Sequence, residues 1–192
     1  IHEKANKRWR SYSIASWPDG NNVFELIIVL DKKGAGTNYI FEEVTVGSEL
    51  IFRGAQGVFT LKEPLDKDLF LICTGTGIAP FRSMVQHIKN KNIPHKNITL
   101  IFGCRRKDTI LYYNEMKELT ASLPGFNYIP TLSREEWEGR TGYVHPVYEE
   151  LCSDKKPAAF MLCGWRGMID EAKQRILDMG YDAKDIHVEI YG

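Results

Sequence analysis

Two different patterns of apolar and polar positions follow one another along the chain. Up to about residue 63, short apolar stretches alternate with turn-forming residues, and the stretches at 10–16, 23–30 and 49–53 are typical of β-strands. Glycine-containing runs at 18–21 and 34–36 mark turns between them. This first pattern predicts a small antiparallel sheet or barrel.

Beyond Pro64 the pattern changes to apolar strands that alternate with amphipathic helices. Strands are predicted at 69–73, 98–104, 126–132, 158–163 and 186–191, and helices at 79–90, 112–123, 145–152 and 166–179. Such a succession is typical of a parallel, doubly wound sheet. In the last helix the apolar residues share one face, and Gly180 stands where a left-handed helix end is expected.

A polar linker separates the two patterns. Residues 63–67 read Glu-Pro-Leu-Asp-Lys, and the proline interrupts any regular element there. We therefore expect two domains, an all-β domain at 1–63 and an α/β domain at 68–192.

Composition and charge narrow the class of protein. The 25 Lys and Arg residues balance the 25 Asp and Glu residues, so the net charge predicts no nucleic-acid partner. The longest apolar runs, near 26–30 and 69–73, are far shorter than the ~18 residues of a membrane span. Four dispersed cysteines without a Cys-x-x-Cys pair predict reduced thiols in a cytoplasmic protein, and no metal site. Because the chain begins at Ile1 instead of Met, we also expect its natural N-terminus to be missing.

The first predicted parallel strand runs directly into a glycine-rich turn. The run Thr74-Gly75-Thr76-Gly77-Ile78-Ala79-Pro80 lets the backbone approach an anion, and Pro80 fits the first turn of the following helix. The run differs from the Gly-x-Gly-x-x-Gly dinucleotide fingerprint, and no acidic residue stands where that fingerprint has its ribose ligand. The residues alone therefore fit a phosphate-binding turn and a plain tight turn equally well.

Five motifs occur in order along the chain. They are Arg10-Ser11-Tyr12-Ser13, Gly54-x-x-Gly57-x-Phe59, Gly75-Thr76-Gly77-Ile78-Ala79-Pro80, Cys163-Gly164-x-x-Gly167-Met168 and Glu189-Ile190-Tyr191. In this order, and over essentially the whole chain, the sequence resembles the ferredoxin-NADP reductase family. The resemblance implies an antiparallel FAD-binding β-barrel followed by a parallel, doubly wound NAD(P)-binding domain. That family normally has its first barrel strands before the arginine motif, and only nine residues precede Arg10, so we expect the barrel to be incomplete.

The FAD site implied by the resemblance begins with Arg10, Tyr12 and Ser13. A guanidinium fork suits a pyrophosphate, a tyrosine ring suits stacking on the isoalloxazine, and a serine hydroxyl suits its reacting edge. In a regular strand Ser13 points away from the other two, so the chain must bend for all three to meet the flavin. Without the other motifs, Arg10 and Tyr12 also fit an ordinary pair on a solvated sheet face. The backbone at Gly36 and the Thr37 hydroxyl resemble the family's second pyrophosphate loop, and a flexible hairpin connection fits them as well.

The resemblance also implies a nicotinamide site. Thr76 would lie between the flavin and the nicotinamide, while Gly75, Gly77 and Pro80 would shape the turn beneath the pyrophosphate. Ser13, Cys163 and Glu189 would serve hydride transfer, and the cofactor-binding set continues with Gly164, Met168 and Tyr191. Tyr191 would stack on the flavin face that the nicotinamide must enter. The structural alternatives are a buried, inert Cys163 and a Tyr191 that completes the core; Phe59 is interpreted as packing.

The segment 133–143 is expected to bind the adenosine end of the dinucleotide. Ser133, Arg134 and Arg140 offer the hydroxyl and the cationic forks that a 2′-phosphate requires, which favours NADPH over NADH. Three glutamates in the same segment would repel that phosphate if they faced it. A solvated loop with internal ion pairs is the alternative.

Hydride transfer between two rings requires positioning and exclusion of water, and no protein nucleophile. The motifs therefore predict a flavoprotein that transfers hydride between NAD(P)H and FAD and passes electrons singly to a ferredoxin or flavodoxin. One alternative is the NADH-dependent reductase component of an oxygenase. Another is a flavin- or nucleotide-binding electron-transfer subunit that does not catalyse hydride transfer.

Overall fold

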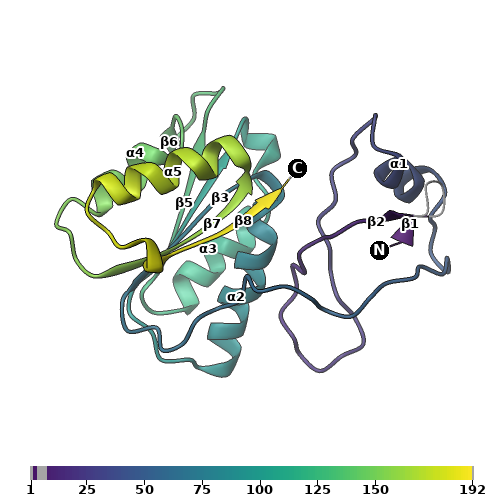
Figure 1. The fold of residues 1–192 in the computed structure, drawn as a ribbon, viewed down its shortest axis with the longest axis horizontal. Coiled ribbons are helices and arrows are strands. Elements are labelled where there is room, and N and C mark those ends of the chain that lie inside the picture. Colours follow the sequence, from purple (N-terminus) through teal and green to yellow (C-terminus); the bar gives the residue numbers. More distant parts are fainter. Residues whose placement is uncertain (1, 4–7, 192) are drawn as a thin grey trace.

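The computed structural model describes residues 2–3 and 8–191. The outermost residues of the two expected domains, Ile1 and Gly192, lie outside this part of the chain. Figure 1 shows a layered α/β part beside a second part made of long irregular segments, the helix α1 (Ala35–Glu42) and the short strands β1 (His2–Glu3) and β2 (Arg8–Trp9). No helix among the described residues is long and apolar enough to cross a membrane.

A six-stranded, all-parallel sheet forms the centre of the α/β part. Its strands are β3 (Asp68–Thr74), β4 (Ile98–Cys104), β5 (Phe126–Leu132), β6 (Arg140–Thr141), β7 (Ala158–Trp165) and β8 (Ile186–Tyr191), in the order β6-β5-β4-β3-β7-β8. The predicted doubly wound sheet is thus confirmed. Within this sheet, the strand that the sequence pattern missed is β6, which has two residues and is too short to show a period.

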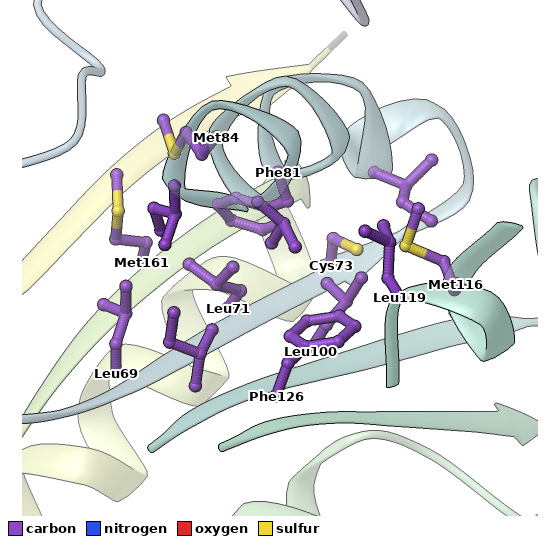
Figure 2. Packing of buried hydrophobic residues seen from close by; sticks show 14 of the residues in the cluster. Leu69, Leu71, Cys73, Phe81, Met84, Leu100, Met116, Leu119, Phe126 and Met161 are labelled. Atoms are coloured by element: carbon purple, nitrogen blue, oxygen red, sulfur yellow. The ribbon is translucent and has the colours of Figure 1, made fainter. Parts of the chain in front are cut away.

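Two helices cover each face of this sheet. One face packs against α2 (Ile78–Lys91) and α3 (Tyr113–Ser122), and the other against α4 (His145–Leu151) and α5 (Arg166–Asp178). Because side chains alternate along a strand, β3 sends Leu69, Leu71 and Cys73 to the first layer, shown in Figure 2, and Phe70 and Ile72 to the second. Burial on both faces explains why the strands of this part read as continuous apolar runs.

The part before residue 63 differs from the prediction. The strand pairs recorded there are β1 (His2–Glu3) with β2 (Arg8–Trp9) and an isolated antiparallel bridge between Ile14 and Leu26. The strands predicted at 10–16, 23–30 and 49–53 are therefore wrong as regular strands within the described chain. A strand needs a neighbour for its backbone hydrogen bonds. Apolar side chains of these stretches stay on the surface, including Val29 and Ile51, which are 66% and 65% exposed.

A helix replaces the loop expected after Gly34. Helix α1 (Ala35–Glu42) begins directly at the run that was interpreted as a phosphate loop or a hairpin connection. Glycine and asparagine favour turns over helices, so local propensity gives this helix little support and pattern reading misses it. Remaining elements are three short 3₁₀ helices: η1 (Gly75–Gly77), η2 (Lys107–Thr109) and η3 (Ala183–Asp185).

Candidate functional site

Two glycine turns meet at the carboxyl edge of the sheet. Strands β3 and β7 are neighbours, with Cys73 opposite Cys163, and each is followed by a turn into a helix. A Cβ atom built on Gly77 would lie 2.3 Å from the Cys163 carbonyl oxygen. A Cβ atom on Gly164, whose φ is +155°, would lie 2.5 Å from the Thr74 hydroxyl oxygen. Both positions therefore favour glycine: Gly77 packs against the backbone of the other turn, and Gly164 packs against the side chains of Thr74 and Met168.

Helices α2 and α5 both begin at this edge. Neither helix has a side chain that caps its first N–H groups. Pro80 lies in the first turn of α2, as predicted, and Met168 is buried in the first turn of α5. Two helix N-termini side by side present N–H groups and positive dipole ends, an arrangement that suits a pyrophosphate.

Three of the predicted hydride-transfer residues lie together beside these turns. The Ser13 hydroxyl donates to Glu189 Oε2 at 2.8 Å, and the Cys163 thiol lies 3.8 Å from the same oxygen. Cys163 and Glu189 are register partners on β7 and β8, whereas Ser13 comes from the first part of the chain. The chain around Ser13 is not a regular strand, which removes the expected conflict over the direction of this side chain.

Burial favours the neutral forms of the thiol and of the phenol beside it. It raises the pKa of the Cys163 thiol well above its ordinary value, and the nearby Glu189 carboxylate raises it further. Burial likewise raises the pKa of the Tyr191 phenol. The Tyr191 hydroxyl oxygen is buried and has no hydrogen-bond partner among the described residues. The site can thus place a neutral thiol, a carboxylate and an unsatisfied hydroxyl next to a ligand, and it holds no thiolate nucleophile.

A second group of predicted residues gathers at the start of α1. The Arg10 side chain covers Gly36, since a Cβ atom there would lie 3.2 Å from Arg10 Cγ and Nε. Burial raises the pKa of Tyr12, and the Arg10 charge counteracts this, so the two side chains are neighbours. The Thr37 hydroxyl is used inside the loop, where it contacts the carbonyl oxygens of Asp31 and Gly34 at 2.9 and 3.1 Å. The guanidinium and the N–H groups at the start of α1 are thus brought together.

The segment expected to bind adenosine lies beside a hollow of about 650 Å³. This hollow is lined by Arg106, Lys107, Asp108, Arg134 and Glu135. Lys107 binds two of the three glutamates. Its backbone N–H donates to the Glu135 carboxylate at 2.9 Å, and its side-chain ammonium pairs with Glu138 at 2.7 Å.

The structure separates the three residues predicted for the 2′-phosphate. Arg134 lines the hollow, whereas Arg140 forms a two-pronged ion pair with Glu150 of α4, at 2.6 and 2.9 Å. Ser133 donates to the Cys104 carbonyl oxygen at 3.3 Å. Sequence reasoning missed Arg106 and Lys107. The signal was available, because both residues follow the end of a predicted parallel strand at the edge where ligands of such sheets bind.

Comparison with known families finds two matches that divide the chain. The model of the family described as "Oxidoreductase FAD-binding domain" matches residues 1–61, and that of "Oxidoreductase NAD-binding domain" matches residues 71–174. Ferredoxin--NADP reductase B of Sorangium cellulosum is 32% identical over 192 residues, which cover 95% of this chain and 78% of the relative. The anthranilate 1,2-dioxygenase electron transfer component of Acinetobacter baylyi is 29% identical over 168 residues, 86% of this chain and 48% of the relative. The chain thus spans about half the length of some relatives.

Solved structures show the same fold. A ferredoxin NADP+ reductase from Neisseria gonorrhoeae with bound FAD and NADP gives a TM-score of 0.76 at 24% identity, covering 95% of this chain and 80% of that one. The Amycolatopsis cytochrome P450 reductase GcoB gives 0.85 at 23% identity, covering 97% and 57%. At these identities the likeness concerns the fold alone.

Proposed function

The chain belongs to the ferredoxin-NADP reductase family of FAD- and NAD(P)-binding oxidoreductases, and from this premise we propose that it transfers hydride between NADPH and FAD. The contact of Ser13 with Glu189 carries the proposal, because it joins the FAD-binding part to the edge where α2 and α5 begin. FAD and the nicotinamide supply the redox chemistry when bound, and the protein supplies their alignment.

Several features of the chain fit an FAD molecule. Arg10 beside the N-terminus of α1 would hold the pyrophosphate, with the Gly36 N–H as a further donor. Tyr12 would stack on the isoalloxazine and Ser13 would face its reacting edge. Thr37 shapes this loop through its own hydrogen bonds, so its contribution is to hold the backbone donors in place. The unpartnered Tyr191 hydroxyl would lie on the same ligand.

The nicotinamide side would use the two interlocked turns. Thr76, Gly77 and Pro80 at the start of α2, and Gly164 and Met168 at the start of α5, would hold the pyrophosphate and the nicotinamide ribose. Cys163, as a neutral thiol, would pack against the nicotinamide ring. Glu189 would orient Ser13 and hold or release a proton at the flavin edge through that hydroxyl.

We infer a preference for NADPH from the hollow around Arg134. Arg106, Lys107 and Arg134 would surround the 2′-phosphate, and Lys107 binds Glu135 and Glu138, which reduces their repulsion of it. Arg140 pairs with Glu150, so we assign it no role in binding the 2′-phosphate. Ser133, bonded to the Cys104 carbonyl, would orient the segment.

Anaerobic mixing of the FAD-loaded protein with NADPH and, separately, with NADH tests both proposals. The readout is the loss of the visible absorbance of oxidised flavin. We expect bleaching by both nucleotides and a higher kcat/KM with NADPH. Arg134→Ala should reduce that preference mainly through KM, while the matched variant Arg140→Ala should leave it unchanged. A flavin that neither nucleotide reduces overturns the proposed activity. An equal or better kcat/KM with NADH overturns only the assignment of the hollow.

For the electron acceptor we propose a one-electron iron-sulfur protein or flavodoxin in the cytoplasm, supported by the relative that is a ferredoxin--NADP reductase. The second candidate is the reductase component of an oxygenase, which the likeness to the anthranilate dioxygenase component favours. Rapid oxidation of the reduced protein by ferredoxin, compared with an oxygenase component, separates the two.

A further inference from the structure

Helix α2 carries a buried cation that the proposed site does not use. The Arg82 side chain is only 10% exposed, and its Nε donates to both carboxylate oxygens of Glu115 on α3 at 2.9 and 3.0 Å. Gln86, one turn further along α2, contacts the same carboxylate. An unpaired buried charge is strongly unfavourable, so this guanidinium depends on its partners.

The remaining partners of Arg82 come from the FAD-binding part. Its Nη1 donates to the Ala15 carbonyl oxygen at 3.0 Å and pairs with the Glu25 carboxylate. The adjacent Ser83 hydroxyl donates to the Ser16 carbonyl oxygen at 2.8 Å. One guanidinium thus bonds to the α/β part through Nε and to the FAD-binding part through Nη1. We refer to Arg82, Glu25 and Glu115 as the clasp.

The segments that the clasp holds are themselves tied together. Ile14 and Leu26 form the isolated antiparallel bridge, and the Ala15 N–H donates to the Glu25 carbonyl oxygen at 2.8 Å. The Glu25 N–H donates in turn to the Ser16 hydroxyl at 3.0 Å. A displacement of Glu25 or of Ala15 should therefore move both segments together.

Tyr112 completes the surroundings of Arg82 at a conformational cost. Its ring lies 4.3 Å from the guanidinium carbon, a cation–π distance. Its φ of 54° is in the left-handed region, which is unfavourable for a bulky residue. Burial opposes the charge of Arg82, but the hydrogen bonds to Glu115 and Glu25 outweigh it, so the pKa of Arg82 is raised. The Arg82 guanidinium therefore stays charged at neutral pH.

The clasp connects the two halves of the proposed site. Helix α2 begins at Ile78, directly after Gly77, which packs against Cys163; Ser13, bonded to Glu189, is only two residues before Ala15. We propose that Arg82 is a positioning residue that sets the distance between the ring held at Ser13 and the nicotinamide held at the start of α2. This inference rests on the proposed hydride transfer. A misplacement of about 1 Å at such a site costs roughly 100-fold in rate, so a loosened clasp should slow the reaction without releasing either ligand.

The test uses the FAD-loaded protein and three variants. Arg82→Gln removes the charge. Glu25→Gln removes only the ion pair between Arg82 and the FAD-binding part, and because the Glu25 side chain is 52% exposed, folding should survive. Arg175→Gln is the matched control, because Arg175 also pairs with two glutamates, Glu149 and Glu171, away from this boundary. The measurements are FAD content, the NADPH dissociation constant, the anaerobic rate of flavin reduction and hydrogen exchange of backbone amides.

We expect Arg82→Gln and Glu25→Gln to slow flavin reduction about 10- to 100-fold, with FAD content and NADPH affinity within about twofold of the parent. Amide exchange should rise at residues 14–16 and 25–26 and stay unchanged in β3 and β7. Arg175→Gln should match the parent in all four measurements. The inference is overturned if the rate is unchanged in both clasp variants, or if exchange rises equally across the whole sheet. If the parent itself is not reduced by either nucleotide, the proposed function fails, which is a different result from a reduced parent whose clasp variants are equally fast.

Discussion

Replacing Gly77 with alanine tests whether the close packing of the two turns matters. The φ of Gly77 is −61°, which alanine adopts readily, so the backbone conformation itself does not oppose the change. The added Cβ atom would lie 2.3 Å from the Cys163 carbonyl oxygen, and ordinary contact begins at 3.4 Å, so the strand and helix must separate by about 1 Å. Overpacking of this kind typically costs about 1–3 kcal/mol.

For a chain of this size, that cost corresponds to a fall in Tm of about 2 to 12 °C, which circular dichroism can follow. A displacement of about 1 Å between the turns should also slow flavin reduction by NADPH roughly 100-fold. The matched control is Gly54→Ala, because an added Cβ atom there meets nothing within 4 Å. If Gly77→Ala keeps both the Tm and the reduction rate of the control, the reasoning from close packing is refuted.

Three further predictions concern single side chains. Arg10→Ala should weaken FAD binding about 10- to 100-fold in a flavin titration, because it removes a charge-assisted contact to phosphate; unchanged flavin content would contradict the assignment. Cys163→Ala should slow flavin reduction and leave FAD content unchanged. A rate equal to that of the parent would show that Cys163 only packs in the core. Cys104 is the one free cysteine that the structure does not bury, so iodoacetamide should modify it first. Burial raises the pKa of Cys104, so the modification rate should rise about tenfold for each pH unit as the pH approaches that pKa from below. Equal modification of Cys73 and Cys163 in the folded protein would show that the thiols are not protected as the structure indicates.

The α/β part was predictable because local and global signals agree there. Leu71 and Ile72 point to opposite helical layers and both are fully buried, so the strand reads as one apolar run. In α5, Ile169 and Ala172 are buried on the predicted face, and Gly180 has a φ of +93° at the predicted helix end. Among the described residues, each strand of this sheet pairs only with other strands of the α/β part. The hydrophobic pattern of this part is therefore sufficient to identify them.

The FAD-binding part was less predictable because a strand depends on a neighbour that the pattern does not specify. The stretch 23–30 has strand composition, yet its recorded pairing is the single bridge at Leu26. Val23 is 75% exposed, so alternation in the sequence did not lead to burial. Similarly, α1 starts in a glycine-rich run that favours turns, and its N–H groups lie under Arg10 instead of a side-chain cap.

The contacts of the candidate site could not be predicted from the sequence for a related reason. Ser13 and Glu189 are 176 residues apart, and nothing in their spacing predicts a hydrogen bond of 2.8 Å. That bond and the clasp are the two ends of one boundary: Ser13 meets β8 at one end, and two residues later Ala15 meets Arg82. Because Glu189 also contacts Cys163, the carboxylate that helps join the two parts is the same one that would face the reacting groups of the proposed site. Under the proposed function, docking of the two parts would also align the two rings. A substitution at this boundary should therefore lower the rate of hydride transfer before it weakens the binding of either cofactor.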